Sequence, residues 1–134
     1  MLSKLSLDQA EAARISLVCV GEAIRRNVAI SVAVVDDAGV LLHFLRMDRA
    51  RPHTVELAMR KARSAAASGV NTRLIEAALK AGIIGNVDSV GLGGAPFPTN
   101  AGCAGAVGVS GASPEVDDEI AAMATDLLPE PNAR

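Results

Sequence analysis

The sequence contains neither tryptophan nor tyrosine, and only two of its 134 residues are phenylalanine. Aromatic side chains that could stack on the bases of single-stranded nucleic acids are therefore scarce. The formal net charge is −2, so the excess of basic residues that attracts the phosphate backbone is missing as well. Together these two shortages argue against nucleic acid as a partner.

Long apolar runs and clustered cysteines are also missing. No apolar stretch reaches the roughly 18 residues of a membrane span, and the start of the chain soon becomes charged, which does not fit a signal peptide. The two cysteines, Cys19 and Cys103, lack the CxxC spacing of a zinc site. Because free thiols are typical of reducing compartments, we expect a cytoplasmic protein that does not enter a membrane.

Small apolar residues are abundant. Hydrophobic residues make up 50% of the chain, and with so few aromatics the core must consist of Ala, Val, Leu and Ile. The length predicts a single domain over residues 1–128 and a disordered tail at 129–134. A domain of this size leaves much apolar surface uncovered, so we expect it to associate with copies of itself.

The first part of the chain predicts a helix followed by a hairpin. A capping box beginning at Ser6 starts a helix that runs to about Arg26. Its expected buried stripe consists of Ala13, Leu17, Val20 and Ile24. Apolar runs at 31–36 and 40–47, rich in β-branched residues and joined by a turn at Gly39, predict two antiparallel strands.

Two further helices are predicted in the middle of the chain. The first runs from about His53 to Gly69, with alanines along one face. The second is short, covers residues 73–80, and is capped by Asn71 or Thr72.

The last third predicts two strands and a final helix. An apolar run at 87–92 favours a strand, whereas the Gly- and Pro-rich stretch 93–98 favours a shaped loop or a sheet edge. Residues 103–110 form a strand interrupted by glycines. Ser113, followed by proline, begins the last helix, which Pro129 ends. The resulting order, α-ββ-α-α-ββ-α, predicts an α+β fold in which helices flank a central antiparallel sheet of about four to five strands.

The hairpin and the helix after it are expected to bring Arg46, Asp48, His53 and Lys61 into one neighbourhood. Arg46 and Lys61 both lie in apolar surroundings, and a buried cation is costly unless it is paired or offered to an anionic ligand. One interpretation is structural ion pairs with Asp48, Asp36 or Glu56. The other is a clamp for a carboxylate ligand, in which a desolvated Lys61 could also act as a base.

The two histidines allow a second pair of interpretations. His43 lies in an apolar strand, where a histidine is commonly part of a core or an interface. His53 lies at a helix start, which favours its neutral form. Either imidazole could instead coordinate a haem iron.

Other catalytic and phosphate-binding motifs are missing. The sequence has no Walker-type phosphate loop and no matching nucleophile elbow around Ser110. The glycine-rich stretch 105–114 leads into a helix, where backbone amides could hold an anion. It could equally be a tight strand-to-helix turn capped by Ser113.

Several motifs together resemble one known family. They are Val34-Val35-Asp36-Asp37-Ala38-Gly39, Leu45-Arg46-Met47-Asp48, Ala58-Met59-Arg60-Lys61-Ala62-Arg63-Ser64-Ala65, Thr72-Arg73, and Gly105-Ala106-Val107-Gly108-Val109-Ser110-Gly111 followed by Asp117-Asp118-Glu119. They resemble the GlcG/HbpS-like family, which also occurs at the C-terminus of some PduO-type cobalamin adenosyltransferases. The resemblance runs from about Leu5 to Met123.

The resemblance implies a helix-flanked antiparallel sheet that assembles into dimers and up to octamers, with links to haem binding or breakdown. It also implies that Arg46, Lys61, Thr72 and Ser110 could line a pocket. The leading hypothesis is an oligomeric protein that binds haem or a related anionic tetrapyrrole, with Asp48 in the same site and His43 or His53 as the iron ligand. The alternative is an enzyme that moves a proton on a small carboxylate with Arg46 and Lys61. A third possibility is an assembly factor without a ligand.

Overall fold

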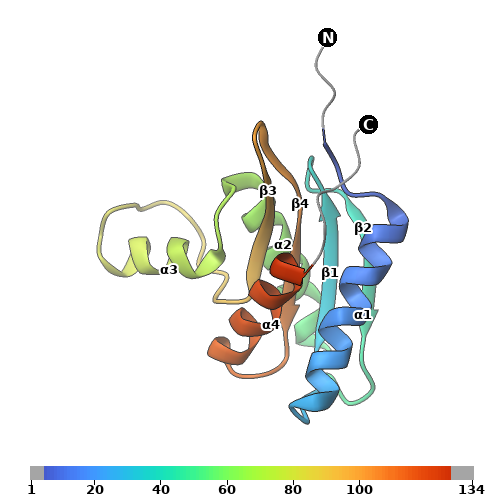
Figure 1. Cartoon of the computed structure of the whole chain (residues 1–134). Helices are drawn as coiled ribbons and strands as arrows, with labels where there is room; N and C mark the ends of the chain where they lie inside the picture. Colours follow the sequence, from blue (N-terminus) through green and yellow to red (C-terminus); the bar gives the residue numbers. More distant parts are fainter. Residues whose placement is uncertain (1–4, 128–134) are drawn as a thin grey trace.

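A computed structural model describes residues 5–127 of the chain. It contains four helices and four strands in the predicted order α-ββ-α-α-ββ-α, which confirms the α+β fold (Figure 1). The elements are α1 (Gln9–Arg25), β1 (Ser31–Asp36), β2 (Leu41–Arg46), α2 (His53–Ser68), α3 (Thr72–Lys80), β3 (Gly94–Thr99), β4 (Gly102–Ser110) and α4 (Pro114–Leu127).

The four strands form one sheet in the order β2-β1-β4-β3, and every neighbouring pair is antiparallel. Helices α1 and α4 cover one face, and α2 covers the other. Helix α3 and the segment 81–93 project from the side of the sheet, and we call the two together the arm (Figure 1). The sheet is therefore the middle layer of three, with the arm beside it.

The face under α1 and α4 holds the larger core. Its fully enclosed members include branched side chains from both helices and from the two central strands: Ile15, Ile120, Val32, Val34, Val107 and Val109. The core consists mainly of aliphatic residues, as the composition predicts, and Phe97 is the one aromatic residue buried in this cluster.

The face under α2 is packed with small residues. Its cluster consists of Ala33, Val35, Ala58, Ala62, Ala65, Ala66 and Ala106. At Gly108 a Cβ would overlap the Ala58 carbonyl oxygen and lie 2.6 Å from the Ala62 nitrogen. The backbone of α2 therefore lies in close contact with strand β4.

Helix α1 departs from the sequence prediction in two ways. Its N-cap is Asp8, which forms a capping box with Glu11, and not Ser6. Ser6 is buried, and its hydroxyl donates to Asp37 Oδ1 at 2.8 Å, because residues before the helix still run beside the sheet.

The expected buried stripe of α1 is also wrong. Leu17 and Ile24 are both 66% exposed, whereas the residues that face the sheet include Ala12, Ile15 and Cys19. Both sides of this helix carry apolar residues, so periodicity alone did not identify the inner one. The outer side is left as exposed apolar surface.

Helix α2 begins at His53 as predicted and ends where Gly69 adopts a left-handed conformation, with φ of 74°. Glycine has no Cβ to clash in that conformation, so it closes the helix at little cost. Asn71, one of the two predicted residues, occupies the N-cap position of α3, although its side chain forms no capping hydrogen bond.

The predicted strand at 87–92 does not form, which is why the sheet has four strands and not five. Instead the Glu76 carboxylate of α3 accepts hydrogen bonds from the Ser89 hydroxyl and from the backbone N–H groups of Val90 and Gly91. The next stretch, β3, is an edge strand despite Pro96 and Pro98, which agrees with the edge interpretation.

The last helix, α4, begins at Pro114, and the Ser113 hydroxyl accepts a hydrogen bond from the Val116 N–H at 3.2 Å. The predicted helix end at Pro129 and the predicted tail at 129–134 lie outside the described residues. Within residues 5–127, no helix is both long enough and apolar enough to span a membrane.

Candidate functional site

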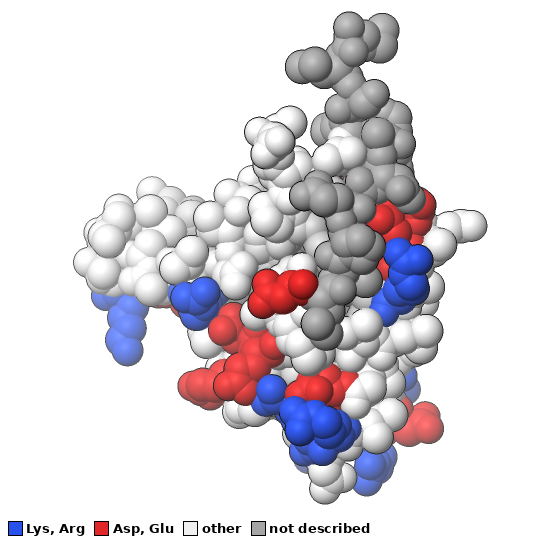
Figure 2. All heavy atoms as spheres, in the orientation of Figure 1, with Lys and Arg blue, Asp and Glu red and all other residues white. Residues whose placement is uncertain are grey.

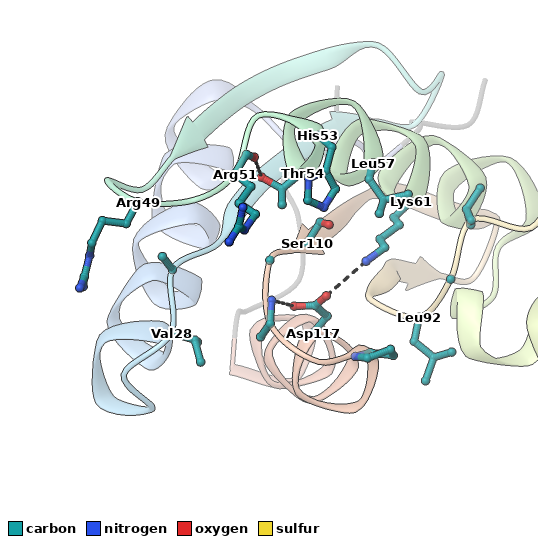
Figure 3. Close-up of a pocket in the computed structure, with 16 residues that line it drawn as sticks. Val28, Arg49, Arg51, His53, Thr54, Leu57, Lys61, Leu92, Ser110 and Asp117 are labelled. Atoms are coloured by element: carbon teal, nitrogen blue, oxygen red, sulfur yellow. Dashed lines mark hydrogen bonds and ion pairs between the residues drawn. The ribbon is translucent and has the colours of Figure 1, made fainter.

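A pocket of about 400 Å³ opens between the first turns of α2 and α4 (Figure 3). Ligand pockets in proteins commonly have volumes of about 300 to 1,000 Å³. The lining side chains come from the β2–α2 loop, from α2, from the end of β4, from α4 and from the segment before β3. The close contact of α2 with β4 therefore forms the floor of this pocket.

Lys61 lies at that floor and is only 3% exposed. Its Nζ donates to the Val109 carbonyl oxygen at 2.9 Å and to Asp117 Oδ2 at 3.4 Å. The other carboxylate oxygen of Asp117 accepts the Ala112 N–H at 3.0 Å. The ion pair thus joins α2 to the start of α4 across the pocket (Figure 3).

The partner of Lys61 was not found from sequence. The predicted partners were Asp48, Asp36 and Glu56, whereas the structure pairs Lys61 with Asp117, 56 residues further along the chain. Asp117 is an acidic residue of the kind that the helix dipole favours near a helix start. It does lie in the first turn of α4, but it is buried and directed at the lysine.

Burial acts on both members of this pair. It lowers the pKa of the Lys61 ammonium below 10.5, and the charge and hydrogen bond of Asp117 oppose that shift. Burial likewise raises the pKa of the Asp117 carboxyl above 3.8, opposed by the Lys61 charge and the neighbouring backbone N–H groups. Each shift moves its group toward the neutral form, as desolvation of a charge must.

The pocket is electropositive for two reasons. Arg49, Arg51 and Lys61 line it, against a single acidic residue, Asp117. The N-terminal turns of both α2 and α4 also line it. Helix N-termini carry partial positive charge, so two of them together with three cations favour an anionic ligand.

His53, Lys61 and Ser110 are the predicted site residues that the structure brings together here. His53 is the exposed first residue of α2, and Figure 3 shows its ring on the pocket side, above Ser110. Ser110 is buried at the end of β4. His53 and Lys61 belong to α2, and Ser110 ends β4, so two elements supply them.

Arg46 and Asp48 do not join them. They line a separate surface hollow with Val20, Leu45 and Met47, so the expectation that Arg46 and Lys61 share one hollow is wrong. The chain turns after β2, with Arg49 in a left-handed conformation and the Ala50 N–H bonded to the Met47 carbonyl. This turn brings residues 49 to 53 to the pocket and leaves residue 46 behind at the end of the edge strand.

Thr72 and His43 also lie apart from the pocket lining. Thr72 is fully buried, and its Oγ1 accepts the Gly94 N–H at 3.0 Å, which fixes the end of the segment beside Lys61. His43 lies on the edge strand β2 opposite Val34, whose side chain belongs to the core under α1. Its Nδ1 is buried without a hydrogen-bond partner.

Arg49, Arg51 and Asp117 are the pocket residues that the sequence analysis missed. One signal could have indicated the arginines: a run of three basic residues, Arg46, Arg49 and Arg51, surrounds a helix start. Among residues 5–127, no group of three or more His, Cys, Asp or Glu residues could hold a metal ion. A haem iron needs fewer protein ligands than such a cluster supplies.

Comparisons with known proteins agree with this architecture. A family model described as haem-degrading protein HbpS-like matches residues 7–126. Protein GlcG of Escherichia coli K12 is 35% identical over 114 residues, which are 82% of this chain and 85% of GlcG. The structure of a double mutant of Streptomyces reticuli HbpS matches with a TM-score of 0.84 at 26% identity, covering 97% of this chain and 92% of that one. The structure of a PduOC:heme complex matches with a TM-score of 0.80 at 25% identity, covering 97% and 98% of the two chains.

Proposed function

This chain belongs to the HbpS-like family, and on that premise we propose that it binds haem or a related anionic tetrapyrrole in the pocket between α2 and α4. The structural observation that carries the proposal is the electropositive pocket itself. The side chains of Arg51 and Lys61 and two helix N-termini meet there, while Arg49 lies at the edge with its side chain directed away (Figure 3). The structure of a PduOC:heme complex supports the choice of ligand, because that relative has the same fold.

The residues present fit a haem. Arg51 lies at the pocket and could hold a propionate, since guanidinium groups bind carboxylates through paired hydrogen bonds. Val28, Leu57 and Leu92 supply apolar surface for the macrocycle. Bound haem would supply an iron centre for redox or ligand-exchange chemistry.

His53 is the candidate iron ligand. It lines the pocket as the first residue of α2, with its ring on the pocket side (Figure 3). A neutral imidazole is the form that coordinates iron. His43 does not line this pocket, so the structure favours His53 between the two predicted ligands.

A hemin titration followed by absorption spectroscopy tests the proposal. We expect a shifted Soret band that saturates at stoichiometric hemin, and we expect His53→Ala to change the band position and weaken binding. His43→Ala is the matched control and should titrate like the native chain. No spectral change with native protein would contradict haem binding, and equal effects of the two substitutions would contradict the role of His53.

We also propose that the chain forms a homo-oligomer, between a dimer and an octamer. Exposed apolar residues support it: Leu17 and Ile24 on α1, and Leu74, Ile83 and Val87 on the arm. Figure 2 shows the upper part of the arm free of charged side chains. Light scattering coupled to gel filtration should give a multiple of the 13.7 kDa chain mass. A monomer at micromolar concentration would contradict this proposal.

A further inference from the structure

The pocket contains a primary amine in an unusual setting, and we propose that Lys61 forms a reversible imine with a small 2-oxo acid. Its carbonyl carbon would react with Nζ, while Arg51 would hold its carboxylate. The inference uses the same electropositive pocket as the proposed function, but it does not depend on haem binding. It adds a covalent activity to a site described so far as a binding site.

Lys61 differs sharply from the other lysines of the chain. The sequence has three, and Lys4 lies outside the described residues. Lys80 is exposed near the end of α3. Lys61 is enclosed at the pocket floor, and its contact to the carboxylate is long at 3.4 Å. Desolvation favours the neutral amine, which is the nucleophilic form.

The segment before β3 passes the end of the lysine with glycines at 91 and 93. A Cβ at Gly93 would lie 3.2 Å from Nζ and only 2.4 Å from the Val109 carbonyl oxygen, so the backbone of this segment packs closely against the amine. A ligand would therefore reach Nζ from the pocket, which Lys61 itself lines. Ser110 and Leu92 line the same pocket.

Asp117 can move the protons that the reaction requires. Its carboxylate first accepts a proton from the ammonium group, which frees the nitrogen lone pair to attack the carbonyl carbon. A C–N bond forms, and a proton moves from nitrogen to the former carbonyl oxygen to give a carbinolamine. Asp117 then returns its proton to that hydroxyl, the C–O bond breaks, and water leaves. The product is an iminium ion beside a carboxylate, and no oxidant or reductant is consumed.

Reductive trapping distinguishes a reactive Lys61 amine from one that only forms a structural ion pair, because only the reactive amine is labelled rapidly. The native chain is incubated with pyruvate and sodium cyanoborohydride, and the modified lysines are identified by peptide mass spectrometry. We expect a carboxyethyl group to form about tenfold faster on Lys61 than on Lys80, because the pocket holds the keto acid beside the Lys61 amine. Comparing two lysines within one folded molecule needs no variant.

Variants then test the assigned roles. Lys61→Arg should abolish the fast adduct, whereas Lys80→Arg should leave it unchanged. Arg51→Gln should raise the pyruvate concentration needed for half-maximal trapping, and Asp117→Asn should slow trapping at saturating pyruvate. Labelling of Lys61 no faster than Lys80, or a fast adduct that survives Lys61→Arg, would overturn the inference.

The experiment also separates this inference from the proposed function. Trapping without hemin binding would leave the imine and remove the haem proposal. Hemin binding without trapping would do the reverse. If both occur, hemin should suppress trapping at Lys61 and not at Lys80, because both ligands would occupy one pocket.

Discussion

The core on the face of the sheet covered by α1 and α4 contains leucine, isoleucine, valine and phenylalanine among its alanines, whereas the core under α2 consists of alanines and one valine. The first face buries more apolar surface per residue, so most of the hydrophobic stabilisation comes from it. The second face lets backbones approach closely, as at Gly108. Buried polar groups near the pocket, such as Thr54 and Lys61, belong to α2 on this second face.

This difference teaches how the fold separates stability from chemistry. Under α2 the hydroxyls of Ser31 and Thr54 form a buried hydrogen bond of 2.8 Å, and Lys61 reaches Asp117 past the sheet. The alanines under α2 are small, so they leave space for these polar side chains at the pocket. We therefore expect enlargement to be most harmful on the α2 face and truncation to be most harmful on the α1/α4 face.

Gly108→Ala should have the largest effect. The new Cβ would overlap the Ala58 carbonyl of α2, which has no alternative position while the helix stays packed. We expect a loss of about 4 kcal/mol or more in unfolding free energy, measured by urea denaturation. Gly21→Ala is the control: its Cβ meets nothing within 4 Å on exposed α1, so it should add about 0.5 to 1 kcal/mol. Equal stability of the two variants would contradict the close contact.

Ile15→Ala tests truncation on the other face. Ile15 is completely buried under α1, so we expect a loss of about 2 to 5 kcal/mol in the same assay. On the α2 face, Ala62→Gly removes one methyl group and should cost about 1 kcal/mol. If the glycine variant were the less stable of the two, the contrast between the faces would be wrong.

Lys61→Met should destabilise the protein by about 3 kcal/mol near neutral pH, because it leaves the Asp117 carboxylate buried and unpaired. Burial raises the pKa of Asp117, so the folded state holds that proton more tightly than the unfolded chain does. Its contribution to stability therefore falls as pH rises from 3.8 through the folded pKa. Removing the lysine charge raises that pKa further and steepens the fall.

The measurement is the Tm of Lys61→Met relative to native protein at about pH 7.5 and about pH 4.5. The deficit should be larger at the higher pH. The double variant Lys61→Met/Asp117→Leu should recover most of the stability, since it removes both buried charges. A deficit independent of pH would show that lost packing of the lysine stem dominates.

The two cysteines allow the comparison of the two faces to be tested without changing the stability of the protein. Cys19 lies in the α1/α4 core with no exposed surface, and burial raises its pKa to about 12. Cys103 packs at the edge of the α2 cluster and is partly exposed. Iodoacetamide should label Cys103 in the native protein and reach Cys19 only after unfolding, as peptide mass spectrometry can show. Comparable native labelling would mean that the α1 core opens readily.

The elements were predictable from sequence where their signals were local. The hairpin, the bounds of α2 and the start of α4 followed from β-branched runs and from capping residues such as Gly69 and Ser113. The strand expected at 87–92 failed because an apolar run also fits a loop held by a distant carboxylate, that of Glu76. A pattern in one segment does not show which partner segment satisfies its backbone.

The pocket was only partly predictable for the same reason. Lys61 was identified because a cation beside an alanine stripe needs a partner. Asp117 was missed as that partner because 56 residues separate them. Arg46 was predicted at the site and Arg51 was not, because the sequence does not reveal the turn after β2, where Arg49 has positive φ.

The central claim is that positive charge at this pocket recruits an anionic ligand, and the hemin affinity of Arg51→Glu tests it most directly. Arg63→Glu is the matched control, because Arg63 is exposed on α2 and lies outside the pocket lining, and the substitution changes the net charge equally. We predict that Arg51→Glu weakens hemin binding by about tenfold or more, while Arg63→Glu leaves it unchanged. Equal hemin affinities for the two variants would contradict the claim.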